Sequence, residues 1–295
     1  MNLSLSRSFP IAKAALAAAV IACAFALACS LAGCASGGTD SSSADADNTS
    51  ASTDGKTLRV AMELAYPPFE TKDDAGNPEG LAVDFIRDFG AAYGYDVQIE
   101  NTAWDGLIPS LQSDKADLVI SSMTITDERK QSVDFSDAYA MAQLAILANA
   151  DSGVASIDDL NQPGKKVAVK TGSTGDVYAT KNLTNAEIVR LADESACVTE
   201  VVQGKADGFL YDQLTIYRNH QANPDTTEAV FIPFQDAEEW GIAVKKGNTE
   251  LLDQLNAFIA QSKTDGEFDR LTEKYLADEK KAFDQYGFKW FFDFE

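Results

Sequence analysis

Short apolar runs alternate with longer amphipathic segments from residue 57 to about residue 277. The short runs predict buried strands, and the longer segments repeat apolar residues at helical spacing. Predicted strands cover residues 58–62, 97–101, 118–121, 166–169, 187–190 and 208–211. Predicted helices cover residues 83–93, 106–113, 174–183, 195–203, 212–220, 249–264 and 266–277. This alternation is typical of α/β layering.

Two further apolar stretches, residues 142–148 and 240–244, lack strong turn residues beside them. They predict long connecting strands. A pair of such crossings is what a hinge between two lobes needs. The roughly 240 residues of the patterned region are enough for one large domain or two lobes of ordinary size.

Polar residues follow four of the predicted strands, at the strand ends where open α/β sheets bind ligands. They are Glu63, residues 121–124, residues 170–174 and Asp212. One such end would be weak evidence. Four of them predict a binding cleft.

Two of these polar segments suggest an anion site. Residues 121–129, SSMTITDER, combine hydroxyls and free amides with Arg129, whose planar fork matches a carboxylate. Residues 172–175 open a predicted helix, and the free amides of a helix N-terminus favour negative charge. Plainer interpretations stay open: residues 127–130 can be a solvated first helical turn, and Ser173 an ordinary N-cap.

The N-terminus predicts export. Arg7 and Lys13 precede an apolar stretch over residues 14–32, which reads as a signal peptide, although its length could also span a membrane. Residues 31–34, LAGC, resemble a bacterial lipobox, which implies cleavage before Cys34 and a lipid on its sulfur. The predicted signal peptide is therefore residues 1–33. Residues 34–56, without large apolar side chains after Cys34, predict a flexible tether.

Composition excludes several classes of function. The net charge is −22, and Arg7 and Lys13 are the only charges before Cys34, so the processed chain is still more acidic. This argues against nucleic acid and anionic surfaces as partners. Cys197 is the only cysteine after Cys34, and the chain has one histidine. We therefore predict no disulfide framework, no metal site, no histidine-based triad and no cofactor.

Together these motifs resemble the family 3 solute-binding proteins, which are extracytoplasmic receptors of polar amino acid ABC transporters. The resemblance covers about residues 58–276. Its marks are Tyr66-Pro67-Pro68-Phe69-Glu70, residues 76–84, 104–109, 121–136, 169–174 and 240–244.

This resemblance implies an α/β, two-lobe periplasmic-binding-protein fold of type II with two hinge strands. Lobe one would comprise residues 57–142 plus 239–295, and lobe two residues 143–238. The protein would be a monomer, lipid-anchored to the cell membrane on its outer side, and would deliver its amino acid to an ABC transporter permease.

The resemblance also implies roles for the site residues. Arg129 would clamp the ligand α-carboxylate with the backbone amides of Thr124 and Thr174. Asp212 would take the α-ammonium, helped by the Ser122 carbonyl and the Thr124 hydroxyl. The full predicted ligand-binding set is Glu63, Tyr66, Trp104, Ser121, Ser122, Thr124, Arg129, Lys170, Ser173, Thr174, Tyr211 and Asp212.

The specificity depends on two charged residues in that set. Tyr66 and Trp104 match positions that flank the ligand side chain, and Glu63, Lys170 and Tyr211 match positions that read its end. If Glu63 and Lys170 both point inward, they suit an amide such as glutamine, which we favour. If Lys170 turns to solvent, Glu63 between the two aromatic rings would suit arginine or lysine.

Two other functions compete with transport. Some cyclohexadienyl dehydratases resemble these receptors, and Glu63 could then act as a general acid; we predict binding without catalysis. A sensor or adhesin could use the same fold without transport. The aromatic tail, residues 283–294, is predicted to pack against lobe one rather than contact a permease or membrane.

Overall fold

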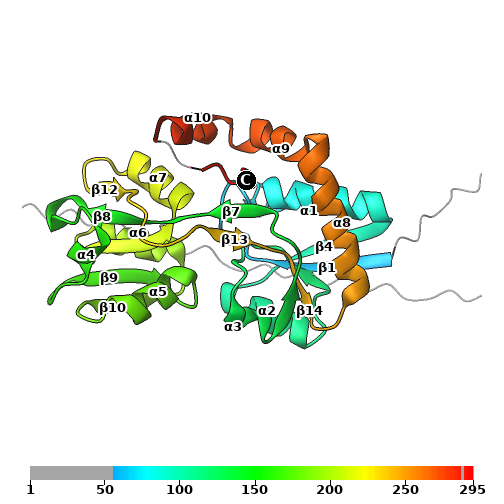
Figure 1. The fold of residues 1–295 in the computed structure, drawn as a ribbon, viewed down its shortest axis with the longest axis horizontal. Coiled ribbons are helices and arrows are strands. Elements are labelled where there is room, and N and C mark those ends of the chain that lie inside the picture. The colour runs from blue at the N-terminus through cyan, green and yellow to red at the C-terminus, as the bar shows by residue number, and fades with distance from the viewer. Residues whose placement is uncertain (1–55, 287–288, 295) are drawn as a thin grey trace, which may run out of the picture. The chain divides into compact units, whose positions relative to one another are not determined.

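The computed structural model describes residues 56–286 and 289–294, and it confirms the α/β prediction with two mixed sheets (Figure 1). The predicted signal peptide, Cys34 and the tether up to residue 55 lie outside the described residues. We call the first sheet with its covering helices lobe one, and the second lobe two. The residue boundaries of the lobes given above stay a prediction.

The sheet of lobe one has five strands. In spatial order they are β4 (Tyr95–Asn101), β1 (Lys56–Met62), β5 (Leu118–Val119), β14 (Ala243–Lys245) and β6 (Val133–Phe135). β1 runs parallel to β4 and β5, whereas β14 runs antiparallel to β5 and β6. Its helices are α1 (Leu81–Tyr93), α2 (Leu107–Gln112), α3 (Asp127–Lys130), α8 (Thr249–Asp265) and α9 (Glu267–Tyr275).

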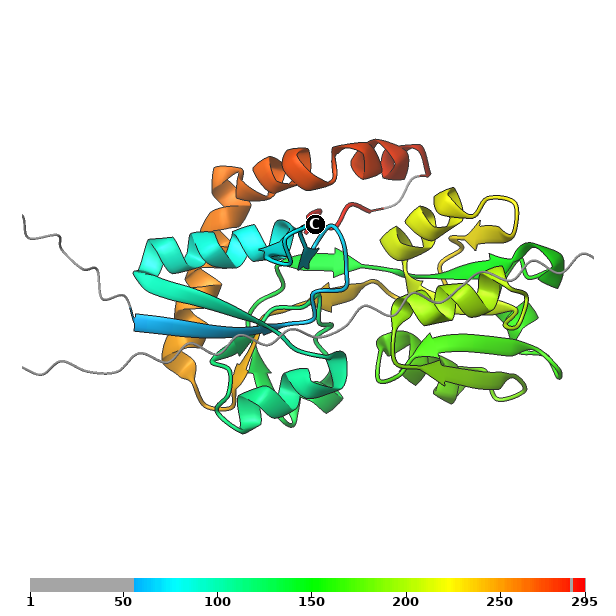
Figure 2. The ribbon, with the colours of Figure 1, turned by 180° about the vertical axis from the view of Figure 1, so that it is seen from behind.

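Short elements complete lobe one. β2 (Thr71–Lys72) and β3 (Pro78–Glu79) form a small hairpin before α1, and η1 (Trp104–Gly106) is a 3₁₀ turn that leads into α2. Figure 2 shows the whole fold from behind.

The sheet of lobe two also has five strands. In spatial order they are β10 (Glu187–Leu191), β9 (Lys166–Lys170), β11 (Gly208–Asp212), β8 (Leu144–Asn149) and β12 (Thr227–Val230). Its helices are α4 (Ile157–Leu160), α5 (Thr174–Asn182), α6 (Glu194–Val202) and α7 (Gln213–Ala222), and η2 (Ala150–Ser152) follows β8. Cys197 on α6 is buried, as expected for a structural thiol, and burial raises its pKa to about 12.

The hinge strands differ in position from the prediction. Most of residues 142–148 form β8 in the sheet of lobe two, and residues 243–244 belong to β14 in lobe one. The apolar character of β8 reflects its central place between β11 and β12, where all but its last residue are buried. A separate two-stranded ribbon, β7 (Ala140–Ala142) paired antiparallel with β13 (Glu238–Trp240), carries the chain between the sheets.

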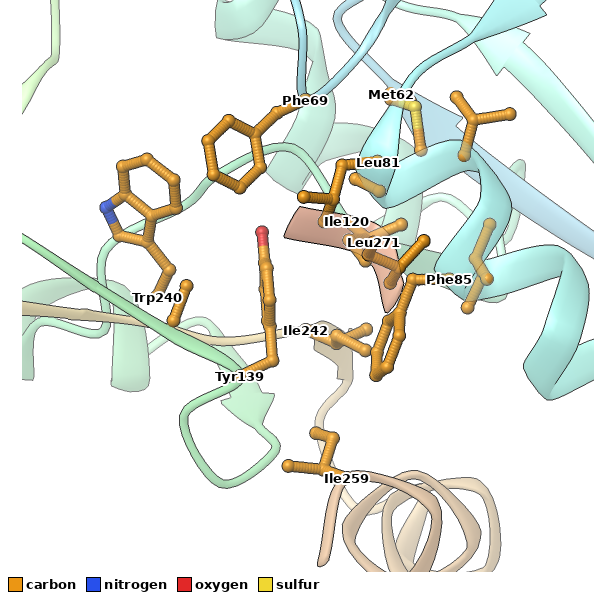
Figure 3. Close-up of a cluster of buried hydrophobic side chains, with 14 of the residues drawn as sticks. Met62, Phe69, Leu81, Phe85, Ile120, Tyr139, Trp240, Ile242, Ile259 and Leu271 are labelled. Carbon is orange, nitrogen blue, oxygen red and sulfur yellow. The ribbon is translucent and has the colours of Figure 1, made fainter. Parts of the chain in front are cut away.

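Aromatic and aliphatic side chains pack together in the core of lobe one (Figure 3). The rings of Phe85 and Tyr139 stack with centroids 6.1 Å apart, and Phe69 packs edge-on to Trp240 at 5.3 Å. Trp240 belongs to β13, so the ribbon between the lobes is fixed in the core of lobe one. Within the described ranges, no helix is both long and apolar enough to cross a membrane.

The aromatic tail packs on lobe one, as predicted for its described residues. After α10 (Ala277–Tyr286), Trp290 is 3% exposed and Phe291 is fully buried. The Phe291 ring lies 5.2 Å from Phe69 and 5.5 Å from Trp240. The amide of Met141 on β7 donates to the Phe291 carbonyl at 2.7 Å. The tail therefore borders the ribbon that joins the lobes.

Candidate functional site

The predicted site residues gather around one cavity. All of them except Lys170 line it. Glu70, Leu144, Glu238 and Trp240, which the sequence did not single out as site residues, line it as well. Because these residues come from both lobes and from β13, the cavity depends on the two lobes being together.

The chain turns sharply after β5, where the most conspicuous polar run begins. Ser122 has φ of +47°, a left-handed conformation that is uncommon for residues other than glycine. Its hydroxyl donates to Oε2 of Glu70 at 3.2 Å. The Ser121 hydroxyl accepts a 3.0 Å bond from the Glu63 amide. This turn therefore brings the ends of β1 and β5 together at the cavity.

Arg129 reaches from the short helix α3 toward lobe two. Its Nη1 donates to the Thr124 carbonyl at 2.7 Å, and its Nη2 donates to the Gly172 carbonyl at 3.2 Å. Burial lowers the pKa of the guanidinium, and the negative charge of Glu238 opposes that shift. Asp127 and Glu128 are exposed, as expected for a solvated helical turn, while Arg129 lines the cavity.

Two backbone amides at the cavity are available to a ligand. None of the described residues accepts a hydrogen bond from the amides of Thr124 or Thr174. Thr174 is the first residue of α5, and Ser173 is its N-cap, accepting from the Asp176 amide at 3.2 Å. The N-cap interpretation of Ser173 is thus correct, and it leaves the next amide free to bind an anion.

Asp212 sits at the end of β11 and caps α7. Its Oδ1 accepts bonds from the amides of Leu214 and Thr215 at 2.9 and 3.1 Å, and from the Tyr66 hydroxyl at 2.8 Å. Asp212 is 6% exposed, and this burial raises its pKa, while the Tyr66 and backbone donors counteract the shift. The Tyr66 bond crosses from lobe one to lobe two.

Lys170 points inward, which answers the question left open by the sequence. It is 4% exposed, and its Nζ forms an ion pair with Oε2 of Glu63. Trp104 lies beside two cations: Lys170 Nζ and Arg129 Cζ are each 5.2 Å from the centroid of its ring. Lys170 therefore acts behind the cavity wall, through Glu63.

Glu70 and Glu238 are the acidic cavity residues that sequence reasoning missed. Glu70 is 1% exposed, and burial raises its pKa well above the ordinary range. It stands in the Tyr66–Glu70 motif, which was a usable signal. Glu238 accepts bonds from the hydroxyls of Thr124 and Thr174 at 2.9 and 2.7 Å. Its immediate sequence neighbourhood, residues 235–239, is mostly acidic or polar and gave no such signal.

Comparison with known proteins gives consistent matches. The model of the bacterial extracellular solute-binding proteins, family 3, matches residues 58–278. A probable histidine-binding protein of Neisseria gonorrhoeae is 35% identical over 260 residues, which cover 86% of this chain and 94% of that protein.

Solved structures agree with the sequence matches. An ancestral amino acid-binding protein, a precursor of cyclohexadienyl dehydratase, has a TM-score of 0.68 at 38% identity, covering 74% of this chain and 94% of its own. An ancestral arginine-binding protein bound to glutamine has a TM-score of 0.69 at 36% identity, covering 75% and 98%.

Proposed function

Because this chain belongs to the family 3 bacterial extracellular solute-binding proteins, we propose that it traps its ligand in the cavity between the lobes. The chain is a polar amino acid-binding component of an ABC transporter and acts outside the cytoplasm. The matched relatives are binding proteins, in line with the prediction that no catalysis is involved. Carriage of the ligand requires closure and reopening of the lobes rather than covalent chemistry.

One observation carries the proposal: a buried carboxylate and a guanidinium face the same cavity from opposite lobes. A desolvated amino acid zwitterion needs both of its charges met by fixed opposite charges. We assign the ligand α-carboxylate to Arg129 and to the free amides of Thr124 and Thr174. The α-ammonium binds Oδ2 of Asp212, since three donors already share Oδ1.

We propose glutamine as the preferred ligand. Glu63 is already paired with Lys170 behind the cavity wall, so it offers the ligand a hydrogen-bond acceptor whose charge is balanced, in place of a free negative charge. Trp104 already has two cations beside its ring, which leaves little benefit for a third cation from the ligand. The arginine-binding relative bound to glutamine supports this assignment, because that scaffold accommodates the amide. Tyr66 and Tyr211, with ring centroids 6.4 Å apart, would border the side chain.

Arginine or lysine is the second candidate. The cavity is lined by four carboxyl groups, on Glu63, Glu70, Asp212 and Glu238, but only one permanent cation, Arg129. This acidic excess favours a ligand with a positive side chain. Glutamine is favoured if the ion pair between Lys170 and Glu63 decides the specificity. Arginine or lysine is favoured if the net negative charge of the cavity decides it.

Calorimetry decides between them. The soluble chain from residue 35 onward is titrated with glutamine, arginine, lysine and histidine. We expect glutamine to bind with a micromolar or lower Kd, or about −8 kcal/mol. Tighter binding of arginine or lysine would favour the second candidate, and absence of heat with all four would reject the proposal. Turnover of prephenate or arogenate would instead indicate a dehydratase.

We also propose that the chain is anchored by a lipid on Cys34 and remains a monomer. The apolar segment and the lipobox-like residues 31–34 support the anchor. Replacement of Cys34 by alanine should move the protein from the membrane fraction to a soluble fraction. An unchanged distribution would refute lipid attachment at this cysteine.

A further inference from the structure

Glu238 occupies a distinctive place, on the ribbon strand β13 and at the edge of the cavity. Glu238 pairs with Ala142 of β7 across the ribbon. Its carboxylate is held from both sides: Oε1 accepts from Gln235 Nε2 at 2.7 Å, and Oε2 accepts from two threonine hydroxyls. Gln235 is fixed in turn, because its carbonyl accepts from Gln143 Nε2 at 3.1 Å.

The two threonines come from different lobes. Thr124 follows β5 in lobe one, and Thr174 begins α5 in lobe two. Their hydroxyls donate to the same oxygen, Oε2 of Glu238, at 2.9 and 2.7 Å. One carboxylate oxygen on the connecting ribbon therefore joins a residue of each lobe.

This arrangement fixes the direction of both hydroxyl protons. A threonine hydroxyl has one proton to donate and two lone pairs that accept. Since each proton is committed to a carboxylate, which is a strong acceptor, the remaining lone pairs of Thr124 can receive only a donor. The α-ammonium of an amino acid is such a donor. The same two hydrogen bonds also keep both threonine side chains in one rotamer.

We propose that Glu238 is a positioning residue of the amino acid site, which orients Thr124 and Thr174 and ties the two lobes at the ribbon. The effect of Glu238 on ligand binding rests on the proposed function, whereas its link between the two lobes does not. Because the groups it orients meet the part shared by all amino acids, Glu238 sets affinity and does not select among side chains. The negative charge of Glu238 also faces Arg129 and opposes the effect of its burial.

The test compares variants of the soluble chain from residue 35 onward. Glu238→Ala removes the acceptor, whereas Glu238→Gln keeps one acceptor oxygen and removes the charge. Glu239→Ala is the matched control, because Glu239 is the next residue on β13, carries the same charge and is exposed. Calorimetry with glutamine, arginine and histidine measures affinity, and small-angle X-ray scattering of the ligand-free protein measures the radius of gyration.

We expect Glu238→Ala to raise the Kd of every amino acid that the wild type binds by about tenfold, the scale of one or two lost hydrogen bonds. The factor should be the same for each ligand, and Glu238→Gln should recover most of the loss. In Glu238→Ala combined with Thr124→Val, the loss should be smaller than the sum of the two single losses, because the two changes share the contact between Thr124 and Glu238.

Other results would overturn the inference. Unchanged or tighter binding by Glu238→Ala would mean that the carboxylate does not position the site. Equal losses of affinity in Glu238→Gln and Glu238→Ala would mean that Glu238 acts through its charge and not by orienting the threonine hydroxyls. If the wild type binds no amino acid, the proposed function fails, yet scattering still tests the tie: a larger radius of gyration in Glu238→Ala than in Glu239→Ala supports it, and equal radii refute it.

Discussion

The hydroxyl of Tyr66 donates a 2.8 Å hydrogen bond to Oδ1 of Asp212, although 146 positions separate the two residues. Tyr66→Phe should weaken binding of every amino acid, because it removes a bond to a buried carboxylate worth about 1.5 to 3 kcal/mol. Calorimetry measures the loss. Tyr95→Phe is the control, since the Tyr95 hydroxyl makes a 2.8 Å bond to Gln254 within lobe one. Equal affinities for Tyr66→Phe and the wild type would contradict the role of Asp212.

The charged groups at opposite sides of the cavity should each be essential. Arg129→Ala or Asp212→Ala leaves one charge of a bound zwitterion unpaired, at a cost of about 3 to 5 kcal/mol in binding free energy. Equilibrium dialysis with labelled ligand would show binding lost at micromolar protein. Arg87→Ala, at an arginine whose bond to the Pro78 carbonyl is 3.4 Å long and exposed, should bind normally. Retained binding in either main variant would remove the assigned clamp.

Lys170 should control the choice between glutamine and cationic amino acids. Lys170→Met removes the cation that neutralises Glu63, so Glu63 becomes a free partner for a positive ligand side chain. Glutamine should bind about tenfold more weakly and arginine about tenfold more tightly, a change of about 1.4 kcal/mol each way. Lys166→Met is the control on the same strand, because Lys166 pairs with Glu187 at the exposed far end of β9. An unchanged ratio of the two affinities would show that Glu63 does not read the side chain.

Stability should depend on the ionisation of Glu194 on α6. Burial raises its pKa to about 8, and the charge of Asp212 adds to the shift, while Lys170 opposes it. The folded state therefore holds a proton that the unfolded chain, with a pKa of about 4.3, releases, so this contribution to stability is full below about pH 4 and is lost as the pH rises toward 8.

Glu194→Gln removes this dependence. Compared with the wild type, the variant should gain stability as the pH rises from 5 to 8, by at most about 1.4 kcal/mol per unit. Urea unfolding at several pH values measures the difference. Glu200→Gln on the same helix is the control, because Glu200 lies 3.6 Å from Lys205. Its free energy of unfolding should change with pH as that of the wild type does. If the stability of Glu194→Gln changes with pH as that of the wild type does, the Glu194 carboxyl is ionised in the folded protein.

The aromatic tail should stabilise lobe one. Phe291→Ala empties a fully buried site beside Phe69 and Trp240 and should lower the free energy of unfolding by about 3 to 5 kcal/mol. Phe294→Ala, at a half-buried ring 5.9 Å from Phe268, should cost no more than about 1 kcal/mol. Thermal unfolding would rank the variants, and equal melting temperatures for the two would argue that the tail does not belong to the core.

The sequence was most informative about groups that recur at strand ends. Glu63 and Ser121 stand at strand ends of one sheet and Asp212 at a strand end of the other, and open α/β sheets bind ligands at such ends, so the place of these residues at the cavity could be predicted. The prediction of the hinge strands was less accurate, because the apolar run of β8 indicates burial in a sheet centre as strongly as it indicates a connecting strand. Hydrophobicity alone does not distinguish the two.

Contacts between distant side chains could not be predicted. Lys170 ends a strand that is buried on both faces, so alternation along β9 did not say whether its Nζ meets Glu63 or solvent. Glu238 lies in an acidic stretch that resembles a solvated loop, and its role depends on two threonines that are 50 residues apart and on different lobes. Such residues are recognised from the assembled geometry.

The place of β14 between β5 and β6 has a consequence for how the chain acquires its structure. The sheet of lobe one is incomplete until residues 243–245 are available, whereas the sheet of lobe two uses only residues 144–230. Domains usually fold as units in the order in which they are made. Here we expect the middle of the chain to finish first, while the N-terminal strands wait for a segment synthesised more than a hundred residues later.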